Sequence, residues 1–313
     1  MKNFWEALDK PILVLAPMDG VTDTVFRQIV CRAGKPEAVF TEFINVDELE
    51  KGSKKLIFAD EERPIVVQIW GTDPEKFYKA AQKLTNFDGI DINFGCPQRK
   101  IIKAGGGAAM ICQMSDLPAG RQVLEILKAT KEGSRGLPVS VKTRIGFDKI
   151  ITEDWIGFLL EQKLAAITVH GRRAVDREAD PANWEEIGKA VRLRGKKKTL
   201  IIGNGDVRSL KEAKEKAEKY GVDGVMIGRA VWNNPWFFSG KIVSERDKLK
   251  MYLQHIQIFE ETYGSNYFFE LRKFAKTYVS GFSGAGEIRN KVMKSGNLEE
   301  MKQVIEKAEG FGV

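Results

Sequence analysis

Short runs of apolar residues recur along most of the chain, and each run ends in a polar residue or a glycine. Most of them are almost continuously apolar and rich in Val and Ile, which is typical of parallel strands buried on both faces. We find eight such runs, at residues 12–17, 37–43, 64–70, 88–94, 138–144, 165–171, 199–205 and 223–229. The pattern therefore predicts eight strands.

Helical patterns fill several of the gaps between these runs. Residues 73–84 begin with Asp73 as a candidate N-cap and Pro74 at the first helical position, where its missing N–H costs nothing. A helix over 206–221 is expected to start at a capping Asp206 and to stop at Gly221. Further helices are expected at 115–133 and 152–163. Strands alternating with helices at this spacing favour a (β/α)8 TIM barrel over an open doubly wound sheet.

The strand pattern stops near residue 240. From Asp247 onward, apolar residues recur at spacings of three and four, within 249–263, 274–279 and 298–308. We therefore expect an α/β chain with a catalytic barrel domain over residues 1–243 and a small all-helical domain over residues 244–313.

Composition limits the partners and the cellular compartment that we expect for the protein. The formal net charge of +7 and the pI near 9.1 are compatible with a polyanionic partner and equally with a lysine-rich solvated surface. The apolar runs are too short to span a membrane, and the N-terminal sequence lacks the apolar core of a secretion signal. Three cysteines without CxxC spacing argue against a disulfide framework or a zinc site. We expect a cytoplasmic monomer with no membrane segment and no metal.

Polar residues gather at the carboxyl ends of the predicted strands, where the active sites of TIM barrels form. A barrel with a purely structural role needs few of them, so this gathering predicts a site at the barrel mouth. In chain order the residues are Pro17 and Met18, Glu42, Gln68, Asn93 and Cys96, Lys142 and Arg144, His170 and Arg172, Asn204 to Asp206, and Gly228 with Arg229.

Two glycine-containing loops follow the last two predicted strands. The sequences "GNGD" (203–206) and "IGRA" (227–230) each put glycine at the entry to a helix, where exposed N–H groups and the helix dipole favour an anion. Each loop alone could be only a tight turn. Together, after strands seven and eight, they predict a bound phosphate, because this is the usual phosphate position of the barrel.

Lys142 interrupts an apolar strand, and alternation turns it inward together with Ser140 and Arg144. An inward lysine needs an anionic or electron-rich partner, because an unpaired buried charge is costly. That partner could be a cofactor or the carboxylate of Glu42. His170 ends a strand at the mouth and is a candidate ligand-binding residue, whereas His255 lies among helical apolar residues.

The stretch "DINFGCP" (91–97) holds a thiol at a strand end. Gly95 permits an unusual turn, and Pro97 fixes the φ angle that follows, so that Cys96 is held at the rim in a defined direction. The alternative is a small buried side chain, since free cysteines are mostly buried.

These residues carry a family likeness. The segment 91–109 resembles the signature of the tRNA-dihydrouridine synthases, and the family's other landmarks follow in the same order. The glycine triplet and "PVSVKTR" resemble the bacterial C-type subfamily, which modifies position 16. The landmarks are "APMDGVTD" (16–23), "TEF" (41–43), "VQIWG" (67–71), "PVSVKTRIGFD" (138–148), "TVHGRR" (168–173), "IIGNGD" (201–206), "VMIGRA" (225–230) and, more weakly, 272–289 in the helical part.

The resemblance implies an FMN-bearing barrel that reduces the C5=C6 bond of a flipped-out uridine in tRNA, with NADPH as the reductant. Reduced FMN would give a hydride to C6, and Cys96 would donate a proton to C5 from the opposite side. The cofactor-binding residues would be Pro17, Met18, Asp19, Gln68, Lys142, His170, Asn204, Gly205, Asp206, Gly228 and Arg229.

Binding of tRNA needs further residues. Asn93, Arg144 and Arg172 are candidates for contacts to the target nucleotide. Residues 265–295 contain six Lys and Arg residues but only two Glu. Arg272, Lys273 and Lys276 recur at helical spacing, as expected of a basic helix face that lies along phosphates. Without the family likeness this segment would be interpreted as an ordinary solvated helix.

Two other functions compete with this one. An FMN barrel of the dihydroorotate dehydrogenase kind would act on a small substrate, but the basic helical segment and the cysteine motif argue against it. A catalytically idle RNA-binding protein would have no need of Cys96, Lys142 and both phosphate loops.

Overall fold

The structure is a computed structural model that describes residues 3–49, 52–112, 117–176 and 179–310. The chain divides into two compact units. The first comprises residues 1–22 and 36–228, and the second comprises residues 23–35 and 229–313. Segments 23–35 and 229–243 therefore belong with the helices rather than with the barrel domain in which the sequence pattern puts them.

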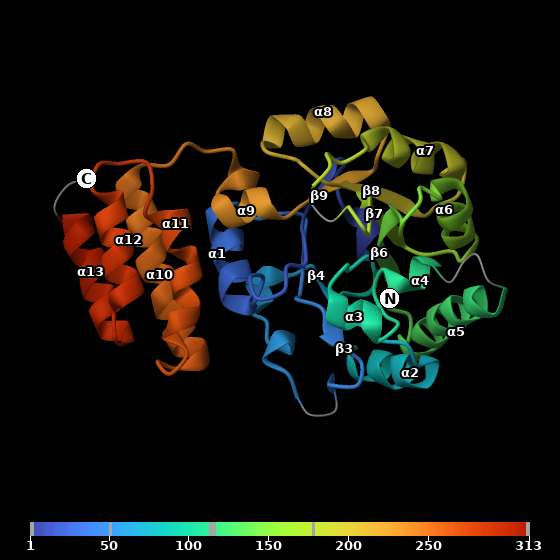
Figure 1. The fold of residues 1–313 in the computed structure, drawn as a ribbon, viewed down its shortest axis with the longest axis horizontal. Coiled ribbons are helices and arrows are strands. Elements are labelled where there is room, and N and C mark those ends of the chain that lie inside the picture. The colour runs from blue at the N-terminus through green and yellow to red at the C-terminus, as the bar shows by residue number, and fades with distance from the viewer. Residues whose placement is uncertain (1–2, 50–51, 113–116, 177–178, 311–313) are drawn as a thin grey trace. The chain divides into compact units, whose positions relative to one another are not determined.

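A closed barrel of parallel strands forms the first unit (Figure 1). Strand β1 pairs with β2 on one side and with β9 on the other, and β2 pairs with β4, so the ring closes. The remaining pairs run β4–β5–β6–β7–β8–β9, all parallel. The strands span Ile12–Leu15 (β1), Ala38–Phe40 (β2), Ile65–Trp70 (β4), Gly89–Phe94 (β5), Val139–Gly146 (β6), Ala166–Arg173 (β7), Leu200–Asn204 (β8) and Gly224–Ile227 (β9).

All eight predicted strands are confirmed, and each lies within or close to its apolar run. One short strand, β3 (Ile44–Asn45), was not predicted. It pairs with the last residues of β4, at the carboxyl end of that strand. Two residues are too few to produce an alternating pattern, so the sequence carries no signal for it.

Helices run along the outside of the strands (Figure 1). Asp73 caps α2 by accepting a hydrogen bond from the N–H of Glu75, as predicted. The predicted Asp206 cap is wrong: Ser209 caps α8, because Asp206 lies in a turn at φ +50° three residues earlier. Gly221 ends α8 in the left-handed conformation, as predicted. The start of the helix predicted at 115–133 lies outside the described residues. The helices span Pro74–Lys83 (α2), Arg99–Lys103 (α3), Ala109–Cys112 (α4), Leu117–Gly133 (α5), Thr152–Glu161 (α6), Trp184–Arg194 (α7) and Leu210–Tyr220 (α8), with 3-10 turns at Phe4–Ala7 (η1), Lys54–Leu56 (η3) and Asp60–Glu62 (η4).

The part of the barrel interior toward the amino ends of the strands is apolar. Ile12 and Val14 of β1, Phe40 of β2 and Ile202 of β8 pack in one buried cluster, which Trp5 of η1 joins. Residues from strands all around the ring can meet only inside it, so these positions face inward. Because side chains alternate between the two faces of a strand, these positions also determine which residues line the interior toward the carboxyl ends of the strands.

The second unit is all-helical. Phe26 of α1 stacks on Phe274 at 5.1 Å between ring centroids and lies 6.1 Å from the ring of His255 in α10. Its core therefore includes a helix from between β1 and β2 that helical spacing alone could not assign to it. The elements are α1 (Thr24–Gly34), α9 (Arg229–Asn233), η6 (Phe237–Ser239), α10 (Glu245–Tyr263), η7 (Phe268–Phe274), α11 (Ala275–Tyr278), α12 (Ala285–Lys294) and α13 (Leu298–Gly310).

Candidate active site

The inward-facing positions change from apolar to polar toward the carboxyl ends of the strands. Two residues beyond Val66 in β4 stands Gln68, and two beyond Ile202 in β8 stands Asn204. Because side chains two apart share a face, both polar residues face the barrel interior. The barrel mouth is therefore lined by hydrogen-bonding groups above an apolar base.

A buried hydrogen-bond network joins β4, β5 and β6. Asp91 accepts from Ser140 Oγ at 2.6 Å and from Gln68 Nε2 at 2.7 Å. Gln68 Oε1 in turn accepts from Asn93 Nδ2 at 2.9 Å. Burial raises the pKa of Asp91 to about 6, although the bonds from Ser140 and Gln68 oppose the rise. The network thus holds a carboxylate in the barrel interior.

The cysteine turn is attached to this network. Asn93 Oδ1 accepts from the backbone N–H of Gly95 at 3.1 Å and from that of Cys96 at 2.9 Å. Cys96 is buried, with 8% of its surface exposed, beside Trp70 and Ile101. Burial raises the pKa of its thiol, while the N–H of Gln98 and the Arg144 guanidinium act in the opposite sense. The sulfur is therefore held as a neutral thiol near neutral pH.

Arg144 and the glycine-rich segment hold the same turn from other sides. Arg144 is buried, and its Nε donates to the carbonyl of Gly95 at 2.8 Å. The N–H of Ala108 donates to the carbonyl of Cys96 at 3.0 Å. A side chain on Gly107, whose φ is +58°, would come within 2.8 Å of that carbonyl oxygen. Arg144, expected to contact substrate, is thus in direct contact with the cysteine turn.

Lys142 faces the barrel interior, in agreement with its alternation. Its Nζ donates to Asn204 Oδ1 at 3.1 Å, and since β7 separates β6 from β8, this bond crosses the inside of the ring. Burial lowers its pKa to about 8, helped by Arg144 and opposed by Asp91. Asn204 is oriented by a second bond, from its Nδ2 to the carbonyl of Met226 at 2.8 Å.

Arg172, His170 and Asp206 form one cluster between β7 and β8. The guanidinium of Arg172 is 4% exposed; it donates to Asp206 Oδ2 at 2.6 Å, lies 3.2 Å from His170 Nε2 and donates to the carbonyl of Asp180. Asp206 Oδ2 also accepts from the N–H of Ala182 at 2.8 Å. The cluster fixes the loop after β7 against the turn after β8.

Two glycines of the predicted phosphate loops pack closely against neighbouring residues. Gly205 has φ +127°, and a Cβ there would lie 2.5 Å from Ala182 Cβ. At Gly228 a Cβ would lie 3.3 Å from Met18 Sδ, which puts the loops after β9 and β1 in contact. A larger residue at Gly205 would therefore collide with Ala182, and one at Gly228 would press against Met18.

The remaining expected cofactor residues lie in different surroundings. Pro17 and Met18 are half-buried after β1, and Met18 accepts the N–H of Val21 in a turn. Asp19 pairs with Lys55 at 2.6 Å and is partly exposed. Arg229 begins α9 and belongs to the helical unit.

The three cations expected to bind tRNA lie on η7 and α11. Lys273 and Lys276 are exposed. Arg272 is half-buried, donates to the carbonyl of Ser295 and lies 5.2 Å from the ring of Phe268. Two exposed lysines are therefore available on this surface, and Arg272 also helps to hold its own unit together.

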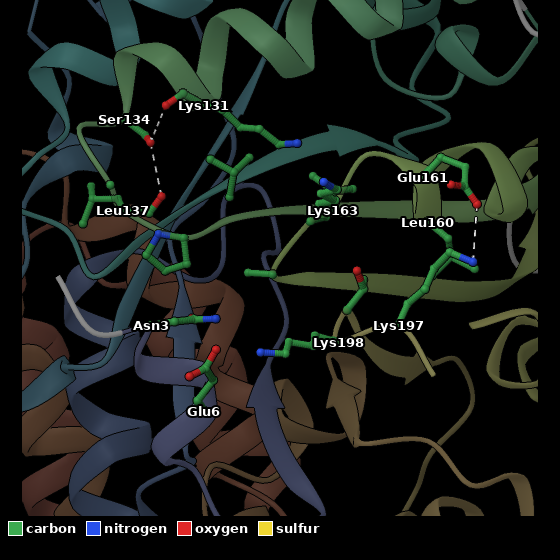
Figure 2. Close-up of a pocket in the computed structure, with 16 residues that line it drawn as sticks. Asn3, Glu6, Lys131, Ser134, Leu137, Leu160, Glu161, Lys163, Lys197 and Lys198 are labelled. Atoms are coloured by element: carbon green, nitrogen blue, oxygen red, sulfur yellow. Dashed lines mark hydrogen bonds and ion pairs between the residues drawn. The ribbon is translucent and has the colours of Figure 1, made fainter. Parts of the chain in front are cut away.

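Two cavities lie at opposite ends of the barrel. One, of about 520 Å³, adjoins the cysteine turn and is lined by Pro97, Arg99, Lys103, Phe147 and Val175 among others. The larger, of about 640 Å³, lies where β6, β7 and β8 begin (Figure 2). Lys131, Lys163, Lys197 and Lys198 surround it, and Lys197 pairs with Glu161. Its greater size does not make it the active site, because the polar network and Cys96 lie at the other strand ends.

Among the described residues, no group of three or more His, Cys, Asp or Glu side chains is arranged to hold a metal ion. A search of the same residues finds no helix long and apolar enough to cross a membrane.

Sequence comparison agrees with this geometry. The family model for dihydrouridine synthase matches residues 14–310, and the chain belongs to the dihydrouridine synthase family. A probable tRNA-dihydrouridine synthase from Staphylococcus aureus (strain COL) is 38% identical over 98% of this chain and 96% of its own length. The probable tRNA-dihydrouridine synthase 2 from Bacillus subtilis (strain 168) is 36% identical over 97% of this chain and 96% of its own.

Solved structures share the fold at low sequence identity. Histamine dehydrogenase from Rhizobium sp. 4-9 superposes with a TM-score of 0.56 at 12% identity, over 82% of this chain and 51% of the other. A 2-naphthoyl-CoA reductase gives 0.55 at 12% identity, over 73% and 49%. These similarities confirm the TIM-barrel fold.

The sequence analysis did not identify Asp91 as a site residue, and it placed Ser140 inside the barrel without giving it a role. A signal for both was present, because each is a polar residue at an inward position of an otherwise apolar strand, two residues before a predicted site residue. Which partners they bind depends on the neighbouring strands, and single-strand patterns do not contain that information.

Proposed function

We propose that this protein is an FMN-dependent tRNA-dihydrouridine synthase that uses NADPH to reduce the C5=C6 bond of a uridine in tRNA. The observation that carries the proposal is the Cys96 thiol, neutral and rigidly held beside an inward-facing Gln68, Asn93 and Lys142 at the barrel mouth. Family membership supports the same chemistry.

The residues at the mouth fit a flavin nucleotide. Lys142 supplies a cationic donor for the edge of the ring where reduction places negative charge, and Gln68 supplies amide hydrogen bonds. The glycine-containing turns after β8 and β9 lie where a TIM barrel usually binds phosphate, and we assign the ribityl phosphate to them. Pro17, Met18, Asp19, His170, Asn204, Asp206 and Arg229 complete the proposed set. Bound FMN supplies the hydride for the reaction.

Cys96 acts as the general acid. Addition of hydride at C6 of uracil leaves enolate-like charge, and a proton must reach C5. A thiol whose pKa is raised keeps its proton at neutral pH, so Cys96 is in the correct protonation state before reaction. Asn93 and Arg144 support the substrate side of the site, both directly and by holding the cysteine turn.

Access of tRNA follows from charge and shape. The cavity beside Pro97 combines Arg99 and Lys103 with apolar Phe147 and Val175, which suits RNA next to the extruded base. Arg172, Arg272, Lys273 and Lys276 are the further candidate contacts, and residues 244–313 form the proposed tRNA-binding part. The protein acts as a monomer in the cytoplasm.

Spectroscopy of the purified protein tests this function. We expect a yellow protein whose flavin absorbance is bleached by NADPH and restored by unmodified tRNA transcript. Failure to bind FMN would contradict the proposal. Restoration by free uracil or orotate at the same rate as by tRNA would favour the small-substrate alternative.

A further inference from the structure

We infer that Asp91 is a positioning residue that sets the orientation of the Gln68 and Asn93 amides and, through them, holds the Cys96 turn. The inference starts from the direction of the hydrogen bonds. A carboxylate can only accept, so Gln68 must present its Nε2 to Asp91, at 2.7 Å.

That choice sets the orientation of the next amide. With Nε2 toward Asp91, Oε1 of Gln68 is the atom left to meet Asn93, which must therefore offer its Nδ2. Asn93 Oδ1 then faces the cysteine turn and accepts from the N–H groups of Gly95 and Cys96. A reversed amide at either position would put two donors or two acceptors together.

The network also sets the chemistry offered to a ligand. Each amide nitrogen has two hydrogens, and the bonds between Gln68, Asn93 and Asp91 use one on each. The second hydrogen of each can only donate. Asp91 therefore fixes the remaining amide hydrogen of Asn93, which keeps 7% exposure, as a donor, and a ligand that meets it must offer an acceptor.

Ser140 completes the arrangement from β6. Its hydroxyl donates to the other carboxylate oxygen at 2.6 Å and keeps Asp91 in position. All four side chains are 7% exposed or less, so water cannot readily replace a lost bond. The value of this device for catalysis rests on the proposed function of Cys96, but its existence does not.

Amide hydrogen exchange of the full-length protein tests the inference. Asp91→Ala removes the acceptor, and we expect exchange at Gly95 and Cys96 to speed up about tenfold while exchange in β7 and β8 is unchanged. Asp91→Asn should restore slow exchange, since its Oδ1 can accept from Gln68 and its Nδ2 can donate to Ser140. Unchanged exchange at Gly95 and Cys96 in Asp91→Ala would overturn the inference.

Two further variants guard against a trivial result. Gln68→Met interrupts the relay without altering Asp91, and it should give the same local increase, with no further increase in the double variant; it also carries the test if Asp91→Ala does not fold. Asp223→Asn alters another buried carboxylate, at the opposite strand ends. An equal increase at Cys96 in Asp223→Asn would mean general loosening and would overturn the inference. None of these readouts depends on flavin reduction or tRNA, so failure here is separate from failure of the proposed function.

Discussion

The side-chain oxygen of Asn93, near the end of β5, accepts the backbone N–H of Cys96 at 2.9 Å, three residues further along the chain. This bond directs the thiol by holding its backbone instead of contacting the sulfur. The sulfur remains available for substrate, while its position depends on a residue in β5 and on the partners of that residue. A reactive group held in this way loses little entropy when substrate arrives.

Replacing the thiol should separate binding from turnover. We expect Cys96→Ala to retain FMN and tRNA binding and to lower the rate of dihydrouridine formation by about 10²–10⁴-fold, the usual contribution of a general acid. Single-turnover oxidation of the reduced flavin by tRNA measures this step. Cys112→Ala is the control, because Cys112 is exposed. A near-normal rate in Cys96→Ala would rule out the proton-donor role.

Asp91 should cost stability when ionised. Burial raises its pKa from 3.8 to about 6, so the folded state binds the proton more tightly than the unfolded state does, although Asp91 is still mostly ionised at neutral pH. The resulting stabilisation is present below pH 4 and is lost as pH rises through 6. Two pKa units correspond to about 3 kcal/mol, so Asp91→Asn should raise the free energy of unfolding by up to that amount at pH 8.

The advantage of Asp91→Asn should vanish near pH 4, where both proteins are neutral at this position. Urea unfolding at a series of pH values measures the difference. A constant difference from pH 4 to pH 8 would show that Asp91 does not titrate in this range.

Lys142 should make flavin binding depend on pH. Its pKa is lowered to about 8 by burial, so the ammonium loses its proton as pH rises through that value. We expect the affinity for FMN to fall above pH 8, and Lys142→Met to abolish this dependence. Equilibrium titration followed by flavin fluorescence provides the measurement, with Lys163→Met at the opposite cavity as control. A pH dependence that persists in Lys142→Met would assign it to another group.

The Arg172–Asp206 pair should matter for folding. Asp206→Asn removes the charge, and asparagine tolerates the positive φ of this position, so no new backbone strain is added. Leaving the buried Arg172 without its carboxylate should cost about 3 kcal/mol. Asp180→Ala is a matched control, since Asp180 contacts Arg172 through its main-chain carbonyl. Equal midpoints of thermal unfolding for wild type and Asp206→Asn would contradict this.

The helical unit should contribute to RNA affinity through charge. Lys273→Glu with Lys276→Glu reverses two exposed cations and should weaken tRNA binding while leaving NADPH-dependent flavin reduction unchanged. If both lysines contact phosphates, the slope of log K against log salt should become shallower by about 2. Filter binding at several salt concentrations measures the slope. Lys307→Glu, an exposed lysine of α13, is the control; an equal loss in that variant would indicate a nonspecific charge effect.

Local patterns in the sequence were enough to predict the barrel. Strands such as 64–70 and 199–205 are almost continuously apolar because both of their faces are buried. The alternation of side chains along a strand was enough to predict that Lys142 points into the barrel. The cysteine motif and the two glycine loops were found for a similar reason, because each depends on a few consecutive residues whose backbone preferences are intrinsic. Family likeness then gave these positions their proposed roles.

Tertiary structure decided what depends on neighbours distant in sequence. The partners of Asp206 are Arg172 and the N–H of Ala182, and no local pattern shows that it would bind them instead of capping a helix. Likewise α1 follows β1 in sequence yet packs Phe26 on Phe274 in the helical unit. Periodicity in the sequence shows which face of a helix is apolar, but it does not show which other element covers that face. The Asp91 network has the same origin: each side chain is set by its own strand, but their contacts exist only because the ring brings β4, β5 and β6 side by side.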